Sequence, residues 1–202
     1  MTAAAAAATA LAFLLDAVVA EPPAAVHPVA AFGRLAGACD RRWRRPRAAG
    51  FAAALFLPLS AAAIAGATVR VAALTPAPAV VAAVLAGLWL FAATSRRMLL
   101  DVSREVLADV RSDTERARES IRALVGRDAA ALSPAELRSG VVESAAENLA
   151  DGLVAPLLAF ALGAQVSLSL AAAAAVWVKA VNTLDSMLGY PSKPHGTASA
   201  RL

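Results

Sequence analysis

The sequence is short of the side chains that build most soluble catalytic sites. Its 202 residues include one cysteine and two histidines, which excludes a disulfide framework and a metal site made of several cysteines or histidines. Only 17% of the residues are charged, whereas a soluble domain averages about a quarter. The chain is also too apolar for a disordered protein, since 59% of its residues are hydrophobic.

The apolar residues lie in four blocks, each about as long as a bilayer crossing requires. A soluble bundle with four such blocks would have little polar surface, so membrane embedding is the better interpretation. The first block lacks the basic start and the small-residue cleavage site of a signal peptide, and it is predicted to be a retained helix. We predict an all-α, multi-pass helical membrane protein with one membrane-embedded domain over residues 1–202. The predicted spans are residues 2–19, 51–69, 77–94 and 152–178.

Arginine placement predicts the orientation in the membrane. Six arginines precede the second block and two follow the third, whereas the link between these blocks has one. The positive-inside rule therefore puts 20–50 and 95–150 in the cytoplasm of a protein of the cell (inner) membrane. Because the first group adjoins a span, anionic lipid is a better partner for it than nucleic acid. The group consists of Arg34, Arg41, Arg42, Arg44, Arg45 and Arg47.

The fourth block can cross the membrane once or form a helical hairpin. A break near Gly163–Gln165 is plausible because Pro156 and Gly163 interrupt the helical pattern. We favour the hairpin, which brings both ends of the block to the cytoplasmic side.

The cytoplasmic segment 95–125 is predicted to be an amphipathic helix. Two apolar series at intervals of four residues, Met98–Val110 and Ala117–Val125, mark its apolar face, and Arg97 is spaced to pair with Asp101. Gly126–Asp128 ends this helix. A capping box in Ser133-Pro-Ala-Glu136 then begins the next one.

That next helix carries three carboxylates, Glu143, Glu147 and Asp151, at i, i+4 and i+8. Positions four residues apart advance by about 40° around a helix, so the three share one face, with Asn148 on its flank. Carboxylate and amide oxygens are ligands for Mg²⁺, and this acidic face is a candidate metal site. The alternative is a solvated acidic face at the lipid boundary.

A second polar face follows the fourth block. Lys179, Asn182, Thr183 and Ser186 share one side of a helix, with Asp185 at its edge. Lys179 is predicted to pair with Asp151 or to bind a phosphate. A lysine that extends to the membrane surface is the alternative, but it does not explain the other polar residues. Gly189 fits the C-terminal cap.

A third and shorter signal surrounds His27. A histidine before proline is usually structural. Because Asp16, Glu21 and Arg34 lie near it in the sequence, His27 and Arg34 are also candidates for binding an anionic substrate.

Two long motifs resemble one known family. They are VVESAAENLADGLVAPL at 141–157 and KAVNTLDSMLGY at 179–190, and shorter matches occur at 27–35, 126–128 and 198–202. The chain resembles, over essentially its whole length, the adenosylcobinamide-phosphate synthase family of cobalamin biosynthesis (CobD/CbiB).

The resemblance implies a multi-pass membrane enzyme that joins aminopropanol, or its O-phosphate, to the free propionate carboxyl of adenosylcobyric acid. The product is an amide and ATP is consumed. From residue chemistry we assign Glu143, Glu147 and Asp151 to Mg²⁺ and to orienting phosphates. Lys179 and Arg34 would neutralise phosphate charge, and Asn182 and Asp185 would complete the metal shell or orient the amine. The full set of predicted catalytic and substrate-binding residues adds His27, Asn148, Thr183 and Ser186.

The sequence departs from this family's pattern in length, since family members continue where this chain stops. On this resemblance, residue 202 is interpreted as an early stop. The chain also has no glycine-rich loop followed by Lys-Ser/Thr, so no nucleotide site is visible.

Two other functions remain open. Asp151–Ala155 resembles the start of the CDP-alcohol phosphotransferase motif, but Pro156 stands where that motif needs arginine. A membrane phosphoalcohol transferase is therefore one alternative. A non-enzymatic membrane scaffold or transport component is the other, although it would not explain the clustered carboxylates.

Overall fold

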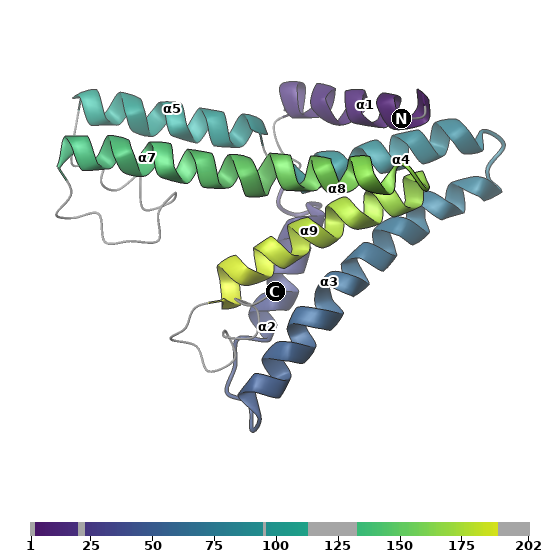
Figure 1. Ribbon diagram of the computed structural model, residues 1–202, viewed down its shortest axis with the longest axis horizontal. Helices are drawn as coiled ribbons and strands as arrows, with labels where there is room; N and C mark the ends of the chain where they lie inside the picture. Colours follow the sequence, from purple (N-terminus) through teal and green to yellow (C-terminus); the bar gives the residue numbers. More distant parts are fainter. Residues whose placement is uncertain (1–2, 20–22, 95, 113–132, 190–202) are drawn as a thin grey trace.

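Every regular element in the described part of the chain is a helix. The computed structural model describes residues 3–19, 23–94, 96–112 and 133–189, and the all-α prediction is confirmed (Figure 1). Besides the short 3₁₀ turn Ala72–Leu74 and the π-helical turn Ala150–Val154, the helices are α1 (Ala3–Val19), α2 (Pro28–Ala38), α3 (Pro46–Val71), α4 (Pro78–Ala93), α5 (Arg96–Ser112), α7 (Pro134–Leu149), α8 (Ala155–Gly163) and α9 (Leu168–Leu188).

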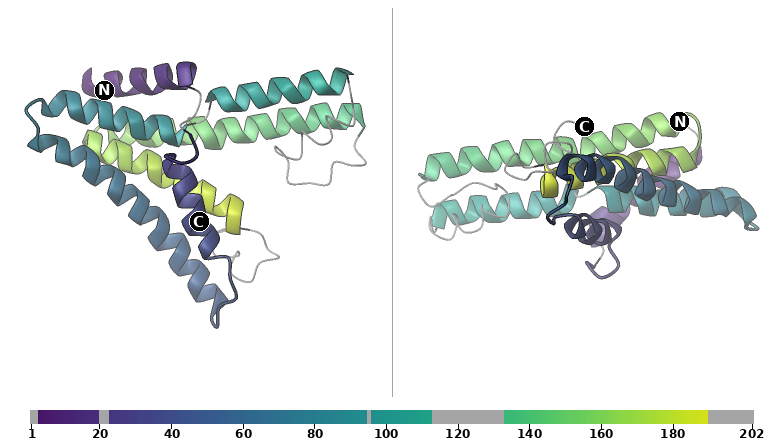
Figure 2. Two further views of the ribbon diagram at one scale, coloured as in Figure 1. Left: turned by 180° about the vertical axis from the view of Figure 1, so that it is seen from behind. Right: turned by 90° about the horizontal axis from the view of Figure 1, so that it is seen from below.

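The apolar helices diverge from one end of the molecule into two branches (Figure 1). The links α3–α4 and α8–α9 lie close together at one end, near the start of α1 (Figures 1 and 2). From there α1 and α4 run toward the start of α5, whereas α9 runs along a second branch that it shares with α2 and α3 (Figure 1). The main packing pairs are α3 with α9, α1 with α4, and α8 with α9.

Small residues let these helices pack closely. The buried face of α1 consists of Ala5, Ala8, Ala12 and Asp16, at intervals of three or four residues. Gly87 of α4 lies so close that a Cβ there would come within 2.8 Å of the Ala8 carbonyl oxygen. Such small-residue contacts are typical of helices that associate within a membrane, and they explain the use of so much alanine.

The lengths of the candidate spans differ from the prediction. Two continuous helices, Pro46–Leu74 and Pro134–Gly163, are long and apolar enough to cross a membrane. The predicted first and third spans are shorter helices, with 17 residues in α1 and 16 in α4. Several large apolar side chains of α3 and α8 are exposed, including Phe56, Ile64 and Leu162. An exposed apolar surface of this kind fits contact with lipid.

The fourth apolar block is a hairpin and does not continue as one helix. Helix α8 ends at Gly163, and α9 begins at Leu168 with Ser167 as its N-cap. A Cβ on Gly163 would lie 2.7 Å from the backbone nitrogen of Ala171, so only glycine permits this approach of the two helices.

The polar helices α5 and α7 form an arm that extends away from the apolar helices (Figure 1). They pack side by side, and Leu137, Val141 and Ser144 form the buried face of α7. The predicted pair between Arg97 and Asp101 is confirmed, with nitrogen and oxygen 3.5 Å apart. The apolar series beyond residue 112 and the Gly126–Asp128 loop lie outside the described residues.

The predicted capping box begins α7. The Ser133 N–H donates to Glu136 Oε2 at 2.8 Å, and the Glu136 N–H donates to Ser133 Oγ at 3.3 Å. These side-chain and backbone hydrogen bonds from Ser133 lower the pKa of the Glu136 carboxyl.

Candidate functional site

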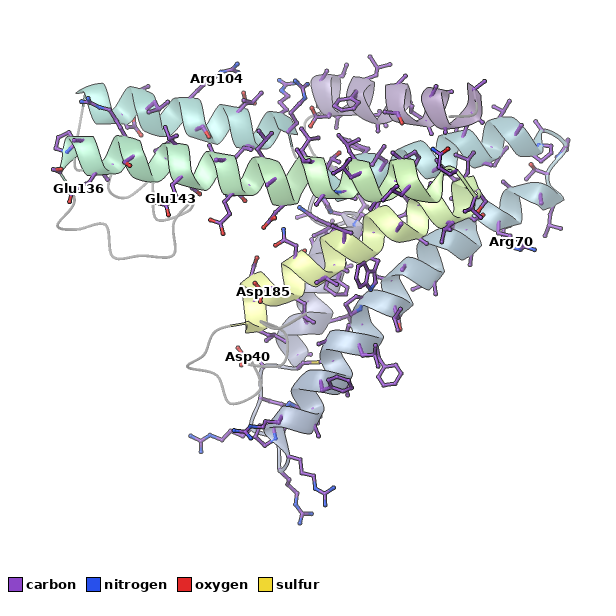
Figure 3. The ribbon with its side chains drawn as sticks, in the orientation of Figure 1. Asp40, Arg70, Arg104, Glu136, Glu143 and Asp185 are labelled. Atoms are coloured by element: carbon purple, nitrogen blue, oxygen red, sulfur yellow. The ribbon has the colours of Figure 1, made fainter. Side chains whose placement is uncertain are left out.

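The acidic face lies on the exposed side of α7, away from α5. Glu143, Glu147 and Asp151 are all exposed, and Figure 3 shows Glu143 on the side of α7 opposite α5. The amide of Asn148 is held against the helix, because its nitrogen donates to the Ser144 carbonyl at 2.9 Å. The carboxylates are therefore accessible to solvent or to a ligand.

A π-helical turn interrupts the helix at the third carboxylate. The N–H of Ala155 donates to the carbonyl of Ala150, so Asp151 lies in a widened turn. The sequence predicted a regular α-helix through all three carboxylates. That prediction is wrong at Asp151, because the regular helix is interrupted there. Such turns occur frequently at functional sites, and this one marks where the polar arm becomes the apolar α8.

The three carboxylates do not converge on one metal ion. Each residue of an α-helix rises 1.5 Å, so Glu143 and Asp151 are separated by about 12 Å along the axis, whereas Mg²⁺ binds oxygen at about 2.1 Å. Among the described residues, no three His, Cys, Asp or Glu side chains are placed to share an ion. The donor chemistry fits Mg²⁺, but one ion would contact only neighbouring carboxylates and would need further oxygens from a substrate.

The second predicted face lies along α9. Thr183 donates to the Lys179 carbonyl at 2.8 Å, and Ser186 donates to the Asn182 carbonyl at 2.9 Å. Both hydroxyl groups are thus bonded to their own helix. The C-terminal cap at Gly189 is confirmed, since its N–H donates to the Asp185 carbonyl at 2.7 Å.

Lys179 and Thr183 border a cavity of about 250 Å³ between α2, α3, α4 and α9. The other lining residues are nearly all apolar, and Phe32 and Trp89 are the largest. Within the described residues, Lys179 forms no ion pair with Asp151. That predicted pairing is wrong here, because α9 places Lys179 on the cavity wall.

The hairpin brings only part of the two faces together. The π-helical turn that contains Asp151 contacts α9. Beyond this contact α9 diverges from α7, so Glu143 and Asp185 lie on separate branches of the molecule (Figure 3).

His27 and Arg34 both lie at α2, which packs against the second half of α9 through Phe32 and Leu184. His27 is the N-cap of α2, and its Nδ1 accepts the Val29 N–H at 3.1 Å. Arg34 is exposed. The structure therefore gives His27 a structural role and leaves Arg34 accessible beside α9.

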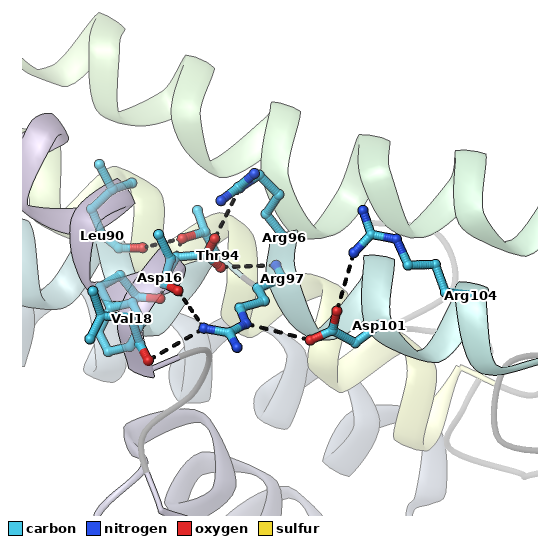
Figure 4. Close-up of polar contacts among 10 residues, drawn as sticks. Asp16, Val18, Leu90, Thr94, Arg96, Arg97, Asp101 and Arg104 are labelled. Atoms are coloured by element: carbon cyan, nitrogen blue, oxygen red, sulfur yellow. Dashed lines mark hydrogen bonds and ion pairs between the residues drawn. The ribbon is translucent and has the colours of Figure 1, made fainter.

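Asp16 forms an ion pair that was not predicted from the sequence. Its carboxylate is buried at the end of α1, where it accepts from Arg96 Nε at 2.9 Å and from the Arg97 backbone N–H at 3.0 Å (Figure 4). Arg97 also donates to the carbonyls of Ala17 and Val18. Two signals for this pair were present in the sequence. Asp16 is a single acidic residue inside the first apolar block, and Arg96 and Arg97 follow directly after the third apolar block.

The fold and these polar faces define a class: a helical protein with membrane-type apolar helices and a carboxylate-bearing arm. The family model described as "CobD/Cbib protein" matches residues 9–202. The chain belongs to the CobD/CbiB family.

Curated relatives agree with this membership. The chain is 41% identical over 202 residues to "Cobalamin biosynthesis protein CobD" of Geobacter metallireducens, covering 94% of this chain and 59% of the relative. It is 37% identical over 184 residues to "Probable cobalamin biosynthesis protein CobD" of Pyrococcus abyssi, covering 89% and 58%. The chain thus spans about three fifths of the length of these relatives. No solved structure matches it.

Proposed function

We propose that this chain acts in cobalamin biosynthesis, as its relatives' names state for them, and that it belongs to an ATP-dependent amide-forming ligase. The substrates are adenosylcobyric acid and aminopropanol or its O-phosphate. The family match over residues 9–202 carries the proposal. The carboxylates of α7 and the lysine of α9 are side chains that such a reaction can use.

The proposed reaction has two steps. The propionate oxygen attacks the terminal phosphorus of ATP, which forms an acyl phosphate and releases ADP. The amine nitrogen then attacks the acyl carbon, the amide C–N bond forms, phosphate leaves, and the amine loses a proton. Activation is needed because a carboxylate at neutral pH is a poor acceptor for an amine.

The described residues suggest a division of roles. Mg²⁺, if bound by Glu147 and Asp151, would screen the negative charge of the phosphate groups. Lys179 of α9 and Arg34 of α2 supply positive charge beside a transferred phosphate. Asn148 and Asn182 offer amide groups for orienting the amine. Glu143 and Asp185 lie on separate branches of the molecule, so only one of these two carboxylates would accept the proton of the amine.

We also propose a multi-pass arrangement in the cell (inner) membrane, with this site on the cytoplasmic face. The two long apolar helices and the excess of arginine at one end support that placement. Both the corrinoid and the amino alcohol would then reach the site from the cytoplasm.

Complementation tests this proposal. A cobalamin auxotroph blocked between cobyric acid and cobinamide is expected to grow when it carries the natural full-length gene. Glu147→Gln and Asp151→Asn are expected to abolish growth while the protein still reaches the membrane. The matched control is Asp101→Asn, which removes an exposed carboxylate from α5 and is expected to support growth. Rescue by both carboxylate variants would reject the assigned roles, and failure of the parent gene would reject the function.

A further inference from the structure

Five arginines occupy a seven-residue stretch at the start of α3. The basic loop, residues 41–47, reads Arg-Arg-Trp-Arg-Arg-Pro-Arg, and all five arginines are exposed. In the described part of the chain, no carboxylate pairs with any of these guanidinium groups. Figure 3 shows nitrogen-bearing side chains extending from this tip of the molecule. The loop is thus a concentrated positive charge that the described fold does not neutralise.

The basic loop adjoins the longer apolar stretch of α3. Pro46–Leu74 is one of the two helices long and apolar enough to cross a membrane. Its other end carries a single basic residue, Arg70, in the last turn of α3. If α3 crosses a bilayer, the basic loop lies at the level of the lipid headgroups on one side.

The aromatic ring within the loop is held in place. Trp43 Nε1 donates to the Cys39 carbonyl at 3.0 Å, which ties the ring to the end of α2. The guanidinium carbon of Arg41 lies 4.0 Å from the centroid of the same ring. Tryptophan is enriched at membrane interfaces, and this stacking restrains Arg41.

The start of α3 adds to the positive potential. Arg45 is the N-cap and makes no side-chain capping hydrogen bond, so the first backbone N–H groups of the helix have no side-chain acceptor there. The positive end of the helix dipole thus coincides with the arginines. We propose that the basic loop binds the phosphate group of an anionic phospholipid. Its continuity with an apolar helix favours lipid over RNA as the source of that phosphate.

Lipid selectivity of the purified full chain tests this proposal. Binding of dioleoylphosphatidylglycerol and of dioleoylphosphatidylcholine is titrated in detergent and read by native mass spectrometry. We expect the parent protein to prefer the anionic lipid and to lose this preference as salt rises from 50 to 500 mM. Each basic residue near an anionic surface contributes about fivefold in binding, so R42Q/R44Q/R45Q is expected to weaken phosphatidylglycerol binding about one hundredfold. Phosphatidylcholine binding is expected to stay unchanged.

A charge-matched control is R70Q/R104Q/R138Q, which removes three exposed arginines outside the basic loop, one each from the far end of α3, from α5 and from α7, and is expected to change binding less than threefold. Size-exclusion profiles and circular dichroism check that both triple variants fold, and the salt titration of the parent protein needs no variant. The proposal fails if the parent binds the two lipids equally, or if the control loses as much affinity as the loop variant. It also fails if millimolar inorganic phosphate displaces the lipid, or if a short RNA outcompetes the lipid at 150 mM salt. The ligation activity proposed above does not enter these readouts.

Discussion

A single buried carboxylate connects the apolar helices to the polar arm. Asp16 is 1% exposed, whereas the side chain of its partner Arg96 is 36% exposed. The free-energy cost of losing the partner therefore differs between Asp16 and Arg96. A buried charge left without its partner is costly, while an exposed guanidinium group can turn to water.

This asymmetry predicts unequal effects of substitution. Arg96→Gln leaves Asp16 buried with only the Arg97 N–H as donor, and we expect a loss of about 3 kcal/mol in the free energy of unfolding. Asp16→Asn keeps an oxygen that accepts the same N–H, and we expect a loss of about 1 kcal/mol. Unfolding in mixed micelles by denaturing detergent measures both.

Arg104→Gln is the control, because Arg104 and Asp101 form an exposed pair at 3.4 Å and such pairs contribute at most about 1 kcal/mol. A larger loss for Asp16→Asn than for Arg96→Gln would contradict the interpretation of the pair.

At the scale of helices, the α8–α9 hairpin depends on one glycine. We predict that Gly163→Ala separates the two helices, because the added Cβ would lie 2.7 Å from backbone atoms of Ala171. Overpacking of this kind costs about 1–3 kcal/mol, and thermal unfolding in detergent is expected to show it.

Gly33→Ala provides the comparison, since its Cβ would meet Met187 Sδ at an ordinary 3.5 Å. Alanine also favours the helix over glycine by up to about 1 kcal/mol. Equal destabilisation by the two substitutions would show that close backbone approach is not the reason for Gly163.

The features that were predicted correctly from the sequence depend on interactions between residues close together in the chain. They include the Ser133–Glu136 capping box, the Gly189 cap and the break after Gly163. The contact between Asp16 and Arg96 depends on packing between α1 and the end of α4, which periodicity does not reveal. The same reason explains why Lys179 lies on a cavity wall and why the acidic face meets α9 only near Asp151.

At the scale of the whole molecule, the proposed multi-pass arrangement makes the hairpin decide which polar residues share a side of the membrane. We predict that a cysteine at Ser186 reacts with membrane-impermeant maleimide only from the cytoplasm, and that one at Gln165 in the α8–α9 link reacts only from outside. Labelling of intact and permeabilised cells, with Cys39→Ala as the background, measures this. A cysteine at Ser186 that reacts only from outside would overturn the topology.

The central claim about the whole molecule is that it catalyses ATP-dependent amide formation. The reaction of the purified natural protein in lipid nanodiscs tests this claim most directly. The protein is incubated with adenosylcobyric acid, ATP, Mg²⁺ and either aminopropanol or its O-phosphate, and products are identified by mass spectrometry. We predict an amide product that requires ATP, with one ADP released for each amide formed and no product from the Asp151→Asn variant. An active preparation that forms the amide without ATP, or that consumes a CDP-alcohol and leaves adenosylcobyric acid unchanged, would contradict the account.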